Sequence, residues 1–243
     1  MRVDAALVAQ GHAASRDRAR AMIAAGSVFL NGQKLSKPAK TVPTDSIFDI
    51  QLADIPWVSR GALKLLGGLA SFPAVDPTGL HCADIGASTG GFTEVLLAEG
   101  AASVAAIDVG TAQLHPTLVA NPKVQVLDGV NARALNADHL LAEPQLIVCD
   151  ASFISLVKIL PAVMGLAAPG CQMLALIKPQ FEVGKGRVGK GGIVRDSALH
   201  QEVTDTIRQW LIADMKWTHL GTVPSPIDGP DGNKEFLIAA TKP

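Results

Sequence analysis

The sequence predicts an α/β protein in which a small α+β domain precedes a larger, doubly wound sheet. The chain has 243 residues, 48% of them apolar, which is enough for two domains with buried cores. After residue 58, apolar segments that end in an acidic residue alternate with helical segments, a pattern typical of a mostly parallel sheet. The segment 53–60 contains Pro56 and is interpreted as a linker. We therefore expect domains over 1–58 and 59–243.

The first domain is predicted to hold two helices and a hairpin. A short helix covers 2–9, and Ser15 is a suitable N-cap for a second helix. A strand over 27–30 is followed by an Asn-Gly pair, which is favoured in two-residue hairpin turns, and the chain then turns back.

Positive charge is concentrated in this domain, although the whole chain has a formal net charge of −1. Residues 1–40 carry seven basic side chains against two acidic ones. Arg16 and Arg20 lie one helical turn apart, and the hairpin adds Lys34 and Lys37. A solvated helix surface would explain the arginines alone, but the helix and the hairpin together favour a phosphate-binding face. The candidate RNA contacts here are Arg16, Arg18, Arg20, Lys34 and Lys37.

The second domain is predicted to alternate strands with helices. The expected strands cover 80–85, 104–108, 124–128, 146–150, 173–178 and 236–240, and the clearest helices cover 90–98 and 198–213. The uncharged run over 159–177 approaches the length of a membrane span, but Pro161 and the Pro169-Gly170 pair favour a helix, a turn and a buried strand.

A loop that contains several glycines follows the first of these strands. Ser88 breaks the GxGxxG spacing of nicotinamide and flavin sites, and Asp84 suits a ligand with an amine better than a pyrophosphate. Asp108 ends the next strand, where a carboxylate can bind both ribose hydroxyls. These features predict an S-adenosylmethionine pocket. Its candidate contacts are Asp84, Gly86, Ser88, Gly90, Gly91, Phe92, Asp108, Asp128 and Asn131.

The same loop permits a different interpretation. Gly86-x-Ser88-x-Gly90 has the spacing of the nucleophile elbow of serine hydrolases, and His200 and His219 follow it in the chain. No HGGG-type oxyanion loop precedes the serine, and the elbow would follow the first strand of its sheet. A serine hydrolase is therefore the weaker hypothesis.

A basic glycine-rich segment over 184–191 resembles a phosphate-binding P-loop. Gly191 stands where a P-loop has Ser or Thr for magnesium, and no apolar strand leads directly into the segment. A basic lid over the substrate is the favoured interpretation. The candidate RNA contacts of this domain are Arg60, Lys185, Arg187 and Lys190.

The cysteines and the first residues of the chain indicate which classes of protein are excluded. Cys82, Cys149 and Cys171 are far apart, with no CxxC spacing, which argues against disulfides and against a zinc site, so no metal is expected. The first residues show no secretory signal. We expect a cytoplasmic protein with reduced thiols and no stable protein partner.

Two parts of the sequence resemble known families. The glycines, basic residues and hairpin of the first fifty residues resemble the small RNA-binding fold named for a ribosomal small-subunit protein, which implies binding of structured RNA. Segments throughout the chain, among them SRGALKL, DIGASTGGF, CDASFISL, LIKPQFEVGKG and SPIDGPDGNKEF, resemble the TlyA family of ribosomal RNA ribose methyltransferases, whose catalytic domain is of the FtsJ type.

The TlyA resemblance implies a Lys–Asp–Lys–Glu tetrad at Lys64, Asp150, Lys178 and Glu235, and cytidine as the target base. We expect Lys178 to accept the proton of a ribose 2′-hydroxyl while Lys64 and Asp150 orient that hydroxyl and Glu235 fixes the lysines. Because lysine is almost fully protonated at neutral pH, the origin of the neutral amine stays open. The family is also called haemolysin-like, so a membrane-active protein is a further alternative, although no amphipathic cationic helix is visible.

Overall fold

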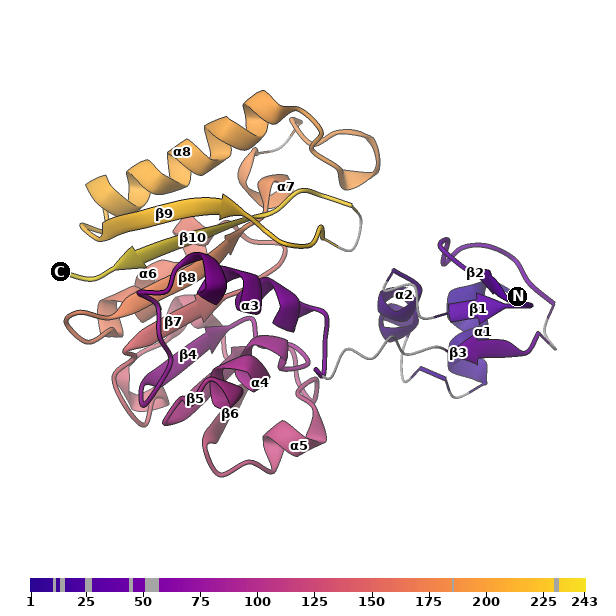
Figure 1. The fold of residues 1–243 in the computed structure, drawn as a ribbon, viewed down its shortest axis with the longest axis horizontal. Helices are drawn as coiled ribbons and strands as arrows, with labels where there is room; N and C mark the ends of the chain where they lie inside the picture. Colours follow the sequence, from indigo (N-terminus) through magenta and orange to yellow (C-terminus); the bar gives the residue numbers. More distant parts are fainter. Residues whose placement is uncertain are drawn as a thin grey trace. The chain divides into compact units, whose positions relative to one another are not determined.

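The computed structural model describes residues 1–10, 12–13, 16–24, 28–43, 46–50, 57–184, 186–229 and 232–243. The chain forms two compact units, Met1–Pro56 and Trp57–Pro243, and each is described by itself (Figure 1).

The first unit combines two helices with a three-stranded antiparallel sheet. Its helices are α1 (Val3–Ala9) and α2 (Arg16–Ala24), and its strands, in the spatial order β2-β1-β3, are β1 (Val28–Leu30), β2 (Gln33–Lys34) and β3 (Phe48–Ile50). Asn31 and Gly32 have φ of 52° and 74°, so the predicted Asn-Gly hairpin turn is confirmed. The strand β3 was not predicted, because three residues are too few to show an alternating pattern. The predicted cap Ser15 lies outside the described residues.

The second unit contains a seven-stranded sheet with the strand order β6-β5-β4-β7-β8-β10-β9. The five parallel strands are β4 (His81–Ile85), β5 (Ser103–Asp108), β6 (Val124–Asp128), β7 (Leu146–Cys149) and β8 (Gln172–Ile177). The α/β fold class predicted from the sequence is confirmed, but β10 (Phe236–Thr241) runs antiparallel to both β8 and β9. The edge strand β9 (Thr218–Pro224) was missed, because its mostly half-exposed residues include a glycine and a terminal proline.

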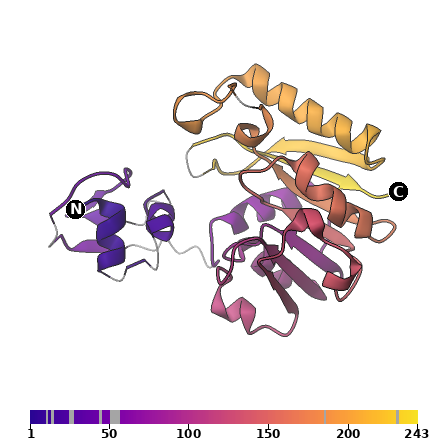
Figure 2. The ribbon, with the colours of Figure 1, turned by 180° about the vertical axis from the view of Figure 1, so that it is seen from behind.

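Helices cover both faces of this sheet, as the strands' alternating side chains require. On one face, Leu174 and Leu237 join a core with α3 (Gly61–Ser71) and α4 (Gly91–Ala98) (Figure 1). On the other face, Met173 and Ile238 pack with α6 (Leu156–Leu166) and α8 (Ser197–Ala213) (Figure 2). The remaining short helices are α5 (Pro116–Val119), α7 (Pro179–Glu182), η1 (Ala132–Ala134), η2 (Ala137–His139) and η3 (Lys190–Gly192).

The uncharged run over 159–177 forms most of α6, a turn at Gly170 and the buried strand β8, as the sequence predicts. Among the described residues, no helix combines the length and the apolar character that crossing a membrane would require.

Candidate active site

The carboxyl ends of β7 and β8 bring together four charged side chains from four parts of the sequence. Asp150 follows β7, Lys178 follows β8, and Lys64 lies on α3. Because β10 is antiparallel to β8 and pairs Phe236 with Ile177, the residue before Phe236, Glu235, reaches the same edge of the sheet. All four positions implied by the TlyA resemblance therefore lie in one place.

These side chains form a continuous chain of ion pairs, called the charge chain below. Lys178 Nζ lies 2.6 Å from Asp150 Oδ1, Lys64 Nζ lies 3.6 Å from Asp150 Oδ2, and Lys64 Nζ lies 2.6 Å from Glu235 Oε2. The side chain of Asp150 is 19% exposed, each lysine 8% and Glu235 1%. Glu235 contacts Lys64, whereas Asp150 is the carboxylate that links the two lysines. Two ammonium groups and two carboxylates give the chain no net charge, which is the arrangement that burial permits.

Three polar groups surround Lys178 Nζ. Besides its ion pair with the Asp150 carboxylate, it donates hydrogen bonds to the backbone carbonyl of Asp150 at 3.0 Å and to Ser152 Oγ at 2.9 Å. One ion pair and two hydrogen bonds hold the Lys178 side chain in a fixed position.

The loop before β10 holds Glu235 in position. A Cβ on the buried residue Gly229 would lie 2.6 Å from Glu235 Oε1, so any larger residue there would displace the Glu235 carboxylate. Asn233, 2% exposed, accepts a hydrogen bond from Val194 N and donates one to Gly192 O, each at 3.0 Å. This amide joins the end of the basic glycine-rich segment to the loop that carries Glu235. Neither residue was predicted from the sequence, because their contacts exist only in the folded chain.

The predicted cofactor loop follows β4 and lies over a buried carboxylate. Asp84 is fully buried; its Oδ2 accepts a hydrogen bond from the Thr93 hydroxyl at 2.7 Å, and its Oδ1 has no hydrogen-bond partner. Burial raises the pKa of Asp84 to about 7, an effect that the Thr93 hydrogen bond opposes and the charge of Asp150 reinforces. Gly86 has a φ of 82°, and a Cβ there would lie 2.9 Å from Ala151 Cα, so the loop approaches the β7 end closely.

The other predicted cofactor contacts divide into exposed and buried groups. Asp108 is half-buried and accepts hydrogen bonds from Ser88 N at 2.8 Å and Gly110 N at 2.7 Å. Asp128, its partner across β5 and β6, is exposed and accepts one from Ala112 N at 2.8 Å. Gly90 is the N-cap of α4 with a φ of 97°. The side chain of Phe92 packs in the core, and Asn131 caps η1, accepting from Arg133 N at 3.1 Å.

These groups fit a ligand that carries both an amine and a ribose. The unpaired oxygen of Asp84 lacks a hydrogen-bond donor, and the Asp108 carboxylate keeps lone pairs for hydroxyl groups. Because glycines have no side chain, the backbone of the loop after β4 can come close to such a ligand.

The structure argues against the serine hydrolase alternative. Ser88 Oγ donates to Gln113 Oε1 at 3.3 Å, whereas His200 Nε2 contacts Val194 O and His219 Nε2 contacts Thr222 Oγ1. No described histidine is hydrogen-bonded to Ser88, and the two histidines that follow it in the chain contact other groups.

The predicted RNA contacts of the second unit have different surroundings. Arg60 is the N-cap of α3, one turn before Lys64, and Lys190 is exposed at the start of η3. Arg187 donates two hydrogen bonds to Glu202 of α8, at 2.5 and 2.6 Å. Lys185 lies outside the described residues.

In the first unit, three arginines surround one buried carboxylate; this group is called the arginine cluster below. Arg2, Arg16 and Arg20 lie 3.0, 3.0 and 3.3 Å from Asp4 Oδ2, and the Asp4 side chain is 0% exposed. Hydrogen bonds from Arg2 and Arg16 hold the pKa of Asp4 well below its usual range. The three guanidinium groups share this one carboxylate and are each about half-exposed.

The other candidates of the first unit were predicted from the helix and the hairpin. Lys34 and Lys37 are exposed, and Arg18 belongs to α2, but its side chain is not among the described ones. The role of Asp4 could not be predicted, because a lone acidic residue in a basic segment shows nothing of its burial.

An exposed aromatic residue beside the charge chain was also missed. Phe153 is 89% exposed and has a φ of 66°, which is unusual for a residue other than glycine. Its ring lies 5.1 Å from that of Phe181, between centroids. Phe153 follows Ser152, which contacts Lys178, so the aromatic pair borders the candidate site.

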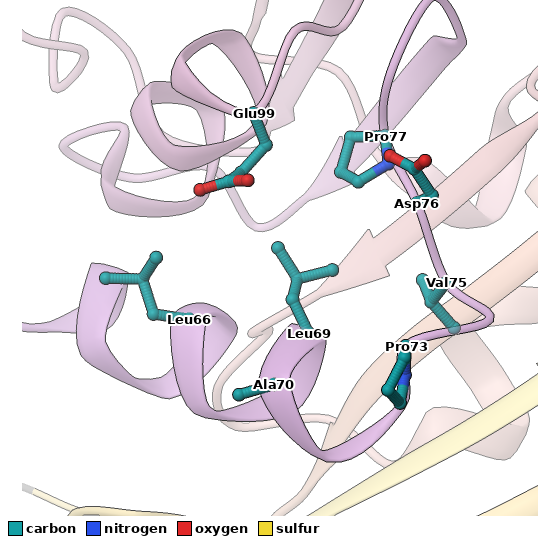
Figure 3. Close-up of a pocket in the computed structure, with 8 residues that line it drawn as sticks. All are labelled: Leu66, Leu69, Ala70, Pro73, Val75, Asp76, Pro77 and Glu99. Atoms are coloured by element: carbon teal, nitrogen blue, oxygen red, sulfur yellow. The ribbon is translucent and has the colours of Figure 1, made fainter.

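A groove of about 360 Å³ lies elsewhere in the second unit, between α3 and the end of α4 (Figure 3). Its lining residues are Leu66, Leu69, Ala70, Pro73, Val75, Asp76, Pro77 and Glu99. None of the predicted site residues is among them.

The buried Asp84 generates a prediction about pH. Because its folded pKa of about 7 exceeds that of an unfolded aspartate, the carboxyl destabilises the fold as pH rises from about 4 through 7, and the loss is complete above that range. Asp84→Asn should remove this contribution, so the free energy of unfolding of the wild type relative to the variant should fall by about 3 kcal/mol between pH 5 and 8.

Urea unfolding at several pH values measures this difference. Thr93→Val, which removes a donor to the charged carboxylate, should raise the pKa of Asp84 further and so increase the total loss of stability between low and high pH. Parallel curves for the wild type and Asp84→Asn would contradict the prediction.

Known proteins show the same organisation in sequence and structure. The FtsJ-like methyltransferase family matches residues 57–242, and the S4 domain family matches residues 1–47. Over 239 residues the chain is 45% identical to the 16S/23S rRNA (cytidine-2'-O)-methyltransferase TlyA of Mycobacterium tuberculosis (strain CDC 1551 / Oshkosh), covering 98% of this chain and 88% of that protein.

Two solved structures extend the comparison. A protein from Streptococcus thermophilus that is named a hemolysin is 38% identical with a TM-score of 0.78, covering 100% of this chain and 88% of that one. A protein from Listeria monocytogenes named as an S-adenosylmethionine-dependent methyltransferase is 14% identical with a TM-score of 0.53, covering 74% of this chain and 100% of that one, and it shares the fold. The predicted resemblance and methyltransferase class are confirmed: this chain belongs to the TlyA family of FtsJ-like methyltransferases.

Proposed function

We propose that this chain transfers a methyl group from S-adenosylmethionine to a ribose 2′-hydroxyl of ribosomal RNA, at a cytidine. The observation that carries the proposal is the charge chain at the carboxyl edge of a methyltransferase sheet, where two lysines and two carboxylates meet within 3.6 Å. The name of the Mycobacterium tuberculosis relative supports the rRNA substrate and the cytidine. In this proposal residues 59–243 form the catalytic domain and residues 1–58 bind RNA.

The cofactor loop and the two strand ends beside it would hold S-adenosylmethionine. Asp84, with an unpaired oxygen, is assigned to the amine, and Asp108 to the ribose hydroxyls; Asp128 and Asn131 are assigned to the adenine side. The remaining contacts are assigned to the backbone of Gly86, Ser88, Gly90, Gly91 and Phe92. When bound, this cofactor supplies a methyl group on a positively charged sulfur.

The charge chain would prepare the hydroxyl for attack. Asp150, the most exposed of the four side chains, and Lys64 orient the hydroxyl, while Glu235 fixes Lys64. Lys178 would release a proton to solvent and then, as a neutral amine, accept the proton of the 2′-hydroxyl, while Ser152 and the Asp150 carbonyl hold its Nζ in place. Positioning of this kind supplies much of the rate in a transfer between two bound molecules.

RNA binding is assigned to the basic groups of both units. In the first unit these are Arg16, Arg18, Arg20, Lys34 and Lys37, and in the second they are Arg60, Lys185, Arg187 and Lys190. The arginine cluster supports the first assignment, because Asp4 holds three half-exposed guanidinium groups in one place. For Arg187, an RNA phosphate would have to replace Glu202.

The aromatic pair would support the target base. A base turned out of an RNA helix is commonly stacked on an aromatic side chain, and Phe153 offers its ring to solvent beside Lys178. Phe153 has a left-handed backbone conformation, which residues other than glycine rarely adopt because it costs conformational free energy.

Methyl transfer tests the proposal directly. Tritiated S-adenosylmethionine with purified small and large ribosomal subunits should label one rRNA in the presence of the wild type, and Lys178→Ala should abolish the label while cofactor binding by calorimetry is retained. Lys178→Arg keeps the positive charge but cannot accept a proton, so it should lose at least about 100-fold in rate. Near-normal turnover by Lys178→Arg would contradict the role of Lys178 as proton acceptor.

The arginine cluster should contribute to RNA affinity through charge. Arg16→Gln should weaken binding to rRNA and reduce the dependence of log affinity on log salt by about one unit, because one phosphate contact is lost. Lys123→Gln, at the amino end of β6, is the matched control and should bind as the wild type does. Filter binding at several salt concentrations gives both quantities, and an unchanged slope for Arg16→Gln would exclude a phosphate contact.

Phe153 should affect methylation and leave folding intact. Phe153→Ala should reduce kcat/KM for rRNA about 10- to 100-fold, the usual value of one base–aromatic stack, whereas Phe153→Tyr should keep most of the activity. Thermal stability should not fall in Phe153→Ala, since the ring is 89% exposed. Leu141→Ala, equally exposed at 86%, is the control. Full activity in Phe153→Ala would show that the ring does not hold the base.

A further inference from the structure

One half-buried glutamine of the second unit, Gln180, has a buried side-chain oxygen with no function in the site described so far. Among the described residues, four buried side-chain oxygens accept no hydrogen bond: Asp84 Oδ1, Asp150 Oδ1, Gln180 Oε1 and Glu235 Oε2. The oxygens of Asp150 and Glu235 are ion-paired with lysines, and Asp84 belongs to the cofactor loop. Only the carboxamide oxygen of Gln180 has neither a partner nor a role. A buried acceptor without a donor is costly, and such a group in a folded protein calls for a ligand or another explanation.

The position of Gln180 connects it to the charge chain. It belongs to the short helix α7, directly after Lys178 and Pro179, and directly before Phe181. Backbone hydrogen bonds from Phe181 N to Lys178 O at 2.9 Å and from Val183 N to Pro179 O at 3.0 Å fix this turn. Gln180 therefore belongs to a fixed turn of the chain, between the lysine assigned to the proton and the residue whose ring contacts Phe153.

We propose that Gln180 determines base specificity, its carboxamide oxygen accepting a hydrogen bond from the exocyclic amine of the target cytosine. This inference rests on the proposed function. An acceptor needs a donor, and cytosine presents an N4 amine where uracil presents the O4 carbonyl. With the amide held in this orientation, uracil would place its O4 acceptor against the Gln180 oxygen, so the site would disfavour uridine.

The test distinguishes recognition of the base by Gln180 from a role of Gln180 in the stability of the fold. Gln180→Met keeps the length of the side chain, removes the acceptor and breaks no hydrogen bond of the acceptor oxygen, so thermal stability should be equal or higher. Its kcat/KM for a cytidine substrate should fall about 10- to 100-fold. The control is Gln209→Met on α8, where the glutamine is exposed, and this variant should match the wild type in both measurements.

The ribosomal subunits are first methylated, and nucleoside mass spectrometry maps the modified cytidine. Methylation is then measured on two rRNA transcripts, one with this cytidine and one with uridine in its place. The wild type should prefer cytidine strongly, and in Gln180→Met this preference should fall toward one because only the cytidine rate declines. Cofactor binding, measured by calorimetry with S-adenosylmethionine, should not change.

Three outcomes would overturn the inference. They are normal cytidine methylation by Gln180→Met, equal losses on the two transcripts, and a loss of thermal stability that parallels the loss of activity. If the wild type methylates no RNA, the proposed function fails and this inference with it. Normal activity in Gln180→Met would remove only the inference.

Discussion

The neutrality of the charge chain is the constraint on which the rest of the catalytic unit depends. Four ionised side chains lie largely out of water, and burial of ions is tolerated only when each has a close partner. Removing any one of them would leave a buried charge uncompensated. The same ion pairs that would orient a hydroxyl thus also join the ends of β7 and β8, the loop before β10 and the helix α3.

The topology of the sheet serves this arrangement. Parallel strands bring Asp150 and Lys178 to one edge, but a parallel last strand would carry the residue before it to the opposite edge. Because β10 enters antiparallel between β8 and β9, the loop before it delivers Glu235 to the lysines. Gly229 and Asn233 then hold that loop against the end of the glycine-rich segment.

Much of this fold could be predicted from the sequence, since buried parallel strands are short apolar runs whose ends are marked by charged residues. The direction of β10 could not, because a reversed strand has the same apolar pattern as a parallel one. The residues of the site could be predicted only through the family resemblance. Single lysines and carboxylates show no periodic pattern in the sequence, so no local signal marks the positions of the charge chain. The full burial of Asp84, the conformation of Phe153 and the isolation of the Gln180 oxygen depend on packing that no local pattern encodes.

The buried carboxylate of Asp4 reduces the conformational entropy that the arginine side chains would lose on binding a phosphate. A free arginine side chain samples many rotamers, and fixing it against a phosphate consumes part of the binding energy. Asp4 restrains three guanidinium groups in the folded unit, before any RNA arrives. The unit thereby gives up one positive charge and gains preorganisation, so a geometrically matched pair of phosphates would be favoured over an arbitrary stretch of polyanion.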